Sequence, residues 1–124
     1  MTSLEIAAIK QPGFSADAQQ GAASAITVHL AGAADGLAHP HLDKYLKELH
    51  REACRVGAAE VNVDVSALHF INSSCLMLFV AWLMCLRDLE ARKQYRVVLA
   101  AGTKQQRRAF DVLANVAAGL VVIQ

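Results

Sequence analysis

A surplus of charge of either sign is missing from this sequence, because 12 lysines and arginines stand against 11 aspartates and glutamates in 124 residues. A balanced chain gives no electrostatic footprint for a polyanion, so we expect no nucleic-acid partner. Long apolar runs are missing too. The longest, Cys75–Leu86, is shorter than the roughly 20 residues of a membrane-spanning helix, and the N-terminus has no apolar signal core. We therefore expect a cytoplasmic protein without membrane insertion.

The sequence has few cysteines, and their spacing indicates no pairing. Cys54, Cys75 and Cys85 form no CxxC pair and leave one over, which argues against a disulfide framework and a cysteine-rich zinc site. Gly-rich nucleotide loops are also lacking, so no cofactor is expected. What the chain has is apolar residues, at 55% against 19% charged. This balance predicts one folded domain over residues 1–124.

Hydrophobic periodicity predicts alternating strands and helices. We expect strands at Leu4–Ile9, Ala25–Leu30, Val61–Val65, Tyr95–Ala100 and Leu120–Ile123, with a loop at Ser15–Ala25 and the second strand ended by Gly32 and Gly36. We expect helices at Pro40–Val56, capped by Gly57, at Cys75–Gln94, and from a Thr103/Gln106 capping box to Gly119. Helical crossovers favour parallel pairing. The prediction is a single α/β domain with a mixed, mostly parallel sheet of about five strands and helices mainly on one face.

Two hydroxyls stand where a strand gives way to a helix. Ser73 and Ser74 open the apolar helix, where free backbone N–H groups and the helix dipole favour an anion by about 0.3–1 kcal/mol. The alternative is that one of them only caps the helix, which contributes about 1 kcal/mol. Spacing alone favours capping.

Three short motifs resemble the STAS domain family, which includes bacterial anti-sigma factor antagonists. Gly32–Asp35 is similar to the Gly-x-x-Asp ending of the family's second strand. Asp64-Val-Ser66 is similar to its Asp-Leu-Ser, and Phe70–Leu76 to its Phe-hydrophobic-Asp-Ser-Ser-Gly-Leu. The order of the motifs along the predicted elements makes the resemblance more specific than any one of them.

The resemblance implies a binding module that is not an enzyme and that works by partner switching. Ser73 would be phosphorylated by a partner kinase or anti-sigma factor of the histidine-kinase-like ATPase type, with Ser74 the alternative, and a PP2C-type phosphatase would reverse it. Asp35 and Asp64 are expected near the phosphosite. Asn72 and Cys75 depart from the family's Asp and Gly, which removes one negative charge and adds one side chain.

The helix after the serines carries a second apolar stripe besides its core-facing one, formed by Leu78, Trp82, Cys85 and Leu89. We expect a protein partner, a second copy of the chain in a homodimer, or the neighbouring helix to cover it.

Other interpretations of the sequence remain open. Within the resemblance, the alternative function is a non-phosphorylated STAS subunit of a lipid-transport ATPase complex. From another class of protein, the alternative is a small serine hydrolase that uses Ser73, His69 and Asp64.

Three further side-chain groups also allow two interpretations each. His39 and His41 offer two imidazoles to a metal, although a surface turn is favoured. Cys75 at a helix start is either a redox-sensitive thiol or a small buried side chain. Lys104, Arg107 and Arg108 form either a solvated face or a contact with an acidic partner.

Overall fold

The computed structural model describes residues 4–124, which form one six-stranded sheet and three α-helices. The strands are β1 (Ile9–Gln11), β2 (Phe14–Gln20), β3 (Ala25–Ala34), β4 (Glu60–Ile71), β5 (Arg96–Ala100) and β6 (Val121–Ile123). The helices are α1 (His39–Val56), α2 (Ser73–Arg87) and α3 (Lys104–Asp111). Neighbours in the sheet follow chain order, the first two pairs antiparallel and the last three parallel. The predicted mixed, mostly parallel sheet is confirmed.

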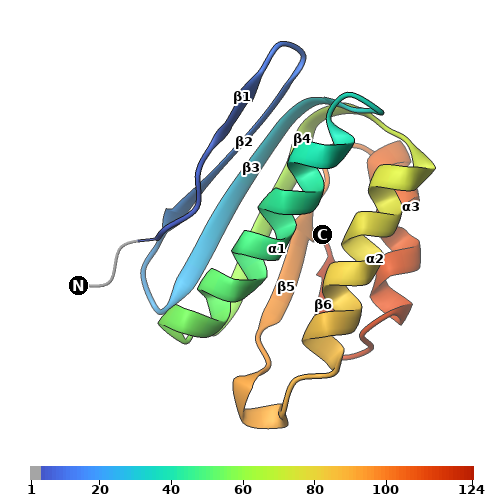
Figure 1. Cartoon of the computed structure of the whole chain (residues 1–124). Coiled ribbons are helices and arrows are strands. Elements are labelled where there is room, and N and C mark those ends of the chain that lie inside the picture. The colour runs from blue at the N-terminus through green and yellow to red at the C-terminus, as the bar shows by residue number, and fades with distance from the viewer. Residues whose placement is uncertain (1–3) are drawn as a thin grey trace.

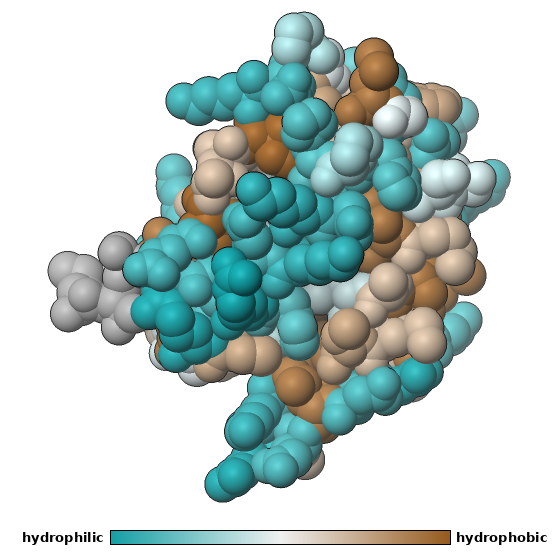
Figure 2. Space-filling model, in the orientation of Figure 1, coloured by the Kyte–Doolittle hydropathy of each residue, from teal (hydrophilic) through white to brown (hydrophobic). Residues whose placement is uncertain are grey.

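The helices lie on one face of the sheet (Figure 1). Alternate residues of β3, such as Val28 and Leu30, are buried beneath them, whereas His29 between these two is exposed on the open face. On the outer side of the helical layer the surface over α1 is hydrophilic, whereas apolar atoms follow the course of α2 (Figure 2). The layer is therefore polar on the outside except along α2.

The N-terminal hairpin corrects two expectations. The strand predicted over Leu4–Ile9 begins only at Ile9, and the loop predicted over Ser15–Ala25 is largely strand β2. In β2, Phe14 and Ala16 are buried while Ser15 is exposed, which is the period of a half-buried strand. The buried positions after Phe14 are alanines, whose small apolar surface gives a weak periodic signal. This strand accounts for the sixth member of the sheet.

Two helices end earlier than their patterns predict. The helix expected over Cys75–Gln94 stops at Arg87, because the Gln94 side chain turns back and its Nε2 donates to the carbonyls of Arg87 and Leu89 at 3.0 and 3.2 Å. The helix expected from Thr103 to Gly119 begins with the predicted capping box but is α-helical only to Asp111. A 3-10 turn over Val112–Asn115 follows and buries Leu113.

Glycine 32 lies within β3 rather than ending it. Its φ is +97°, and the Ala33 N–H next to it donates to the Gly13 carbonyl at 2.7 Å. A Cβ at this position would overlap the Gly13 carbonyl group. The approach of the β1–β2 turn to β3 therefore requires glycine both for its φ and for its lack of a side chain.

We predict that Gly32→Ala lowers the free energy of unfolding by more than about 2 kcal/mol, because it adds a backbone clash to the roughly 1–2 kcal/mol cost of a left-handed residue. Gly119→Ala is the matched control, since its φ is +85° but a Cβ there meets no atom. Gly119→Ala should lower the free energy of unfolding only by the cost of its left-handed backbone conformation. If urea unfolding gives equal losses of free energy for both variants, the close approach of the Gly13 carbonyl to residue 32 is contradicted.

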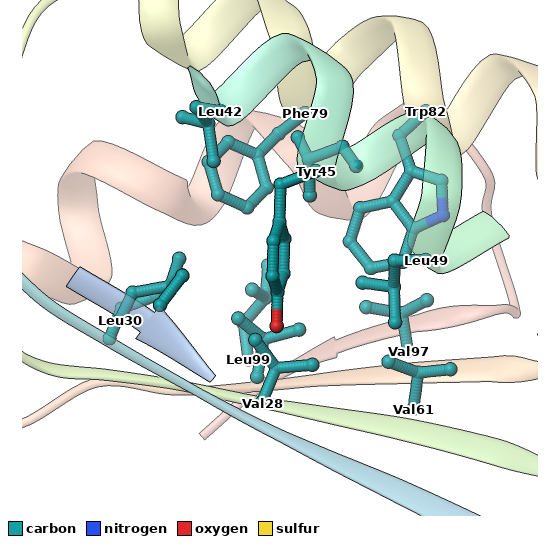
Figure 3. Packing of buried hydrophobic residues seen from close by; sticks show 14 of the residues in the cluster. Val28, Leu30, Leu42, Tyr45, Leu49, Val61, Phe79, Trp82, Val97 and Leu99 are labelled. Carbon is teal, nitrogen blue, oxygen red and sulfur yellow. The ribbon is translucent and has the colours of Figure 1, made fainter. Parts of the chain in front are cut away.

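The two tyrosines of the core differ in how their hydroxyls are satisfied. The Tyr45 ring lies between α1 and the sheet with its hydroxyl directed at the strands near Val28 (Figure 3), and that oxygen has no hydrogen-bond partner among the described residues. Burial raises the pKa of Tyr45, with smaller contributions from Asp17 and Glu48. The Tyr95 hydroxyl, also buried, accepts from Trp82 Nε1 at 2.8 Å and lies 2.7 Å from His50 Nδ1.

We predict opposite effects for the same substitution at these two sites. Tyr45→Phe should leave stability unchanged or raise it by about 1 kcal/mol, because it removes a buried hydroxyl that has no partner. Tyr95→Phe should lower stability by about 1–3 kcal/mol, because it leaves the Trp82 donor unpaired. Thermal unfolding of both variants is the measurement. A larger loss of stability for Tyr45→Phe than for Tyr95→Phe would contradict the hydrogen bonding described for the two hydroxyls.

Candidate functional site

Asn72 fixes the junction between β4 and α2. Its N–H donates to the Ala34 carbonyl at 3.0 Å, which holds it to the end of β3. Its Oδ1 accepts from the Cys75 N–H at 2.8 Å, so Asn72, and not either serine, is the N-cap of α2. Ser73 and Ser74 occupy the first two helical positions with exposed side chains. The expectation that one of the serines caps the helix is wrong, and both hydroxyls are left at the surface.

The loop between β3 and α1 lies against this helix start. Asp35 Oδ1 accepts from the N–H groups of Leu37 and Ala38, each at 3.1 Å, which shapes the loop. The Asp35 carbonyl accepts from Cys75 Sγ at 3.4 Å. Asp35 therefore lies against the first turn of α2, where it contacts Cys75. Burial, aided by the charge of Asp35, raises the pKa of Cys75, which favours the small buried side chain over the reactive thiol.

Exposed apolar side chains come from the three segments that meet at Ser73. Leu37 in the β3–α1 loop is 87% exposed, Phe70 near the end of β4 is 50% exposed, and Met77 one turn into α2 is 60% exposed. Sequence reasoning missed these residues. Leu37 stands alone in a loop, and the other two belong to runs in which apolar residues face both ways. We call Leu37, Phe70 and Met77 the apolar rim of Ser73.

Asp64 does not lie at this site. In the sheet it is paired with His29, whereas Asn72 bonds to Ala34, five residues or about 16 Å further along β3. Its carboxylate accepts from the Ser66 hydroxyl and N–H at 2.6 and 2.9 Å and lies 3.4 Å from His29 Nδ1. The hydrogen bonds from Ser66, more than the nearby His29, lower the pKa of Asp64. The expectation that Asp64 adjoins the phosphosite is therefore corrected, because the long strand β4 separates the two.

The residues of the hydrolase hypothesis are not brought together. Asp64 holds Ser66, and within residues 4–124 no hydrogen bond joins His69 to Ser73 or to Asp64. His69 instead lines a groove of about 500 Å³ between the end of β4 and α3. Among the residues that the structure describes, neither His69 nor Asp64 is therefore positioned as a general base on Ser73.

The remaining polar groups of the sequence are dispersed over the surface. Across the described chain, no three His, Cys, Asp or Glu side chains are arranged to hold a metal ion. Lys104, Arg107 and Arg108 are exposed on α3. No helix of residues 4–124 has the length and apolar character to cross a membrane.

The predicted second stripe of α2 lies along the groove between α1 and α2. Trp82 is only 4% exposed and belongs to the core, so the neighbouring helix and the sheet already cover it. Leu78 and Leu89 are half-buried and Cys85 is exposed. A groove of about 150 Å³ remains, bounded on α2 by Leu78, Ala81, Trp82 and Cys85 and on α1 by Asp43, Leu46, Lys47 and His50. The stripe is thus partly interior and partly surface.

A chain of hydrogen bonds crosses the floor of this groove. Because the indole N–H of Trp82 can only donate, the Tyr95 oxygen accepts from it, and the same hydroxyl is hydrogen-bonded to His50 Nδ1 at 2.7 Å. Burial lowers the pKa of His50. The Tyr95 hydroxyl, on the residue just before β5, thus joins His50 of α1 to Trp82 of α2.

No protein-family model matches the chain, and no curated protein matches it. An anti-sigma factor antagonist from Mycobacterium paratuberculosis has a similar structure, with a TM-score of 0.62 and 15% identity over 92% of this chain and 90% of that one. The anti-sigma factor antagonist SpoIIAA in its unphosphorylated form gives a TM-score of 0.54 and 19% identity over 79% and 81%. The STAS fold that the motifs predicted is confirmed.

We predict that acid weakens the α1–α2 contact through His50. Because its folded-state pKa is lowered, stability should be full above the unfolded value of about 6.5 and should fall as pH decreases through 6.5 toward the folded pKa. Unfolding free energies between pH 8 and pH 5 are the measurement. His50→Gln should reduce this acid-induced loss of unfolding free energy. His69→Gln, which changes an exposed histidine, should lose as much unfolding free energy as wild type does. The same pH slope in wild type and His50→Gln would contradict this role.

Proposed function

We propose that the chain is a protein-binding module of the partner-switching type, whose unmodified form binds a kinase or anti-sigma factor and is released when Ser73 is phosphorylated. Two known anti-sigma factor antagonists share its fold. The observation that carries the proposal is the exposure of Ser73 at the first position of α2, where three segments that each carry an exposed apolar side chain of the apolar rim come together. A surface that presents a hydroxyl together with large exposed apolar side chains is suited to contact by a protein.

The helix start can accept a phosphate without loss of the fold. α2 has no acidic residue in its first turn, and the partial positive charge there favours an anion by about 0.3–1 kcal/mol. Asn72 adds no negative charge where the family's usual residue is Asp. The effect of phosphorylation would therefore fall on the interface, where a phosphate of about −1.5 to −2 charges beside Asp35 would have to be desolvated by the partner.

The proposed partners are proteins of the histidine-kinase-like ATPase type, with a PP2C-type phosphatase to restore the unmodified form. The proposal assigns no catalysis to the chain itself. The phosphosite is Ser73, with Ser74 the alternative, and Asp35, Asn72 and Cys75 are the residues that shape it.

A second candidate is a subunit of a lipid-transport ATPase complex that is not phosphorylated. Two substitutions favour it, since Asn72 and Cys75 stand where the family's phosphorylated motif has Asp and Gly. The buried Cys75 side chain is tied to Asp35 and directed inward, however, so it does not obstruct a kinase at Ser73. We therefore place this alternative second.

We predict that phosphorylation of Ser73 weakens binding to the partner kinase or anti-sigma factor by about 10²-fold or more. The partner is first identified by pull-down from native cells, and its affinity is then measured by calorimetry for wild type, Ser73→Ala, Ser73→Asp and the phosphorylated chain. Ser74→Ala, which changes the adjacent exposed hydroxyl, is the matched control and should bind as wild type does.

Several results would decide against parts of this proposal. Equal affinities for the phosphorylated and unmodified chain would rule out the switch. Modification confined to Ser74 would move the site by one residue. A transporter ATPase as the partner, with Ser73 unmodified in cells, would establish the second candidate instead.

A further inference from the structure

The outward face of α2 is apolar along most of its length. Between Cys75 and Leu86 the helix has no charged residue, and the side chains that reach solvent there belong chiefly to Met77, Ala81, Met84 and Cys85. Met77 and Met84 are 60% and 42% exposed. We call these four residues the outer stripe of α2; it follows the apolar band of Figure 2. Surface helices normally carry polar residues on this face, so the stripe indicates a surface that another molecule covers.

We propose that a second copy of this chain covers the outer stripe, by antiparallel packing of α2 against α2 around a twofold axis at Ala81. The inference goes beyond the proposed function, and its surface shares Met77 with the apolar rim of Ser73. An uncharged stripe meets its own copy without like-charge repulsion, and the Asp43 and Lys47 side chains that line the groove beside it are paired with each other at 3.1 Å. A twofold contact also requires a surface that complements itself.

The stripe has this self-complementary form. At its centre Ala81 is small enough for two helices to approach closely, and the methionines on either side project outward. With the axis at Ala81, Met77 of one copy faces Cys85 of the other, and Met84 faces Leu78. Leu78 lines the groove of about 150 Å³ between α1 and α2, which offers space for the tip of the opposing methionine.

The charges at the two ends of the stripe are complementary in this arrangement. Ser74 at the start of α2 would face Asp88, the C-cap just beyond its end, in the other copy. The first turn contains no acidic residue of its own, and an exposed carboxylate near a helix N-terminus is stabilising by about 0.3–1 kcal/mol. The Asp88 carboxylate also lies 3.5 Å from Arg87 Nε of its own chain, and this exposed ion pair reduces its charge only in part. The same contact occurs twice, once at each end of the helix pair. A parallel pairing would instead place the two Asp88 side chains together.

The contact is small. A helix of 15 residues is about 22 Å long, and a single helix pair lies at or below the lower end of interface sizes for stable complexes. We therefore expect a concentration-dependent dimer with a Kd of about 1–100 µM, rather than an obligate one.

Sedimentation velocity of the purified chain from about 1 to 500 µM tests the proposal. The expected result is a shift from the mass of one chain, 13.3 kDa, toward twice that mass as concentration rises. Ala81→Glu, which would place two carboxylates on the axis, should stay monomeric across the range. Ala109→Glu is the matched control, because it makes the same change at an exposed alanine of α3, and it should dimerise as wild type does. Circular dichroism checks that each variant is folded.

A cross-link tests the arrangement itself. In a Cys54→Ser/Cys85→Ser background, Ala81→Cys should form a disulfide-linked dimer on mild oxidation, since residue 81 meets its own copy at the axis. Cysteine placed at Ala109 in the same background should not. A wild type that remains monomeric at 500 µM, a dimer unaffected by Ala81→Glu, or equal cross-linking at both positions would each overturn the proposal.

Discussion

The hydrogen bonds of Asn72 determine how α2 is placed, and much of the molecule follows from them. The bond to Ala34 ties the end of β4 to the end of β3, and the bond from Cys75 sets the first turn of the helix. With the helix started there, Phe79 and Leu83 face the sheet and complete the core, as their full burial shows. The same rotation turns Ser73 and Ser74 outward. The core-facing residues and the exposed site are therefore two faces of α2, and Asn72 determines how this helix is rotated about its axis.

The one-sided cover of the sheet concentrates the surface features at one end of the molecule. Because β3 and β4 are parallel and the helices share one face, the β3–α1 loop and the β4–α2 junction lie side by side. Asp35 holds the loop through its backbone contacts, and its carbonyl meets Cys75. Residues about 40 positions apart in sequence thus form a single surface around Ser73. The open face, with His29 and Asp64, lies on the other side of the sheet.

Much of this arrangement could be predicted from the sequence, and the exceptions have physical causes. The period of α1 and its cap at Gly57 were clear because its apolar and charged residues separate by face. Strand β2 was missed because its inward positions after Phe14 are alanines, and the end of α2 was missed because a side chain seven residues beyond Arg87, that of Gln94, closes it.

For the site, the order of motifs identified Ser73 and Asp35, but Asp64 was misplaced because short motifs contain no information on strand length. The exposed Leu37 carried no periodic signal, and only the folded loop reveals its position.

If the partner binds the surface around Ser73, hydrogen–deuterium exchange of the chain with and without its partner will show it. We expect slower exchange of the backbone amides of residues 35–38 and 72–77 in the complex, and loss of that protection when Ser73 is phosphorylated. Protection confined to the open face of the sheet, around His29 and Asp64, would show that the partner binds elsewhere.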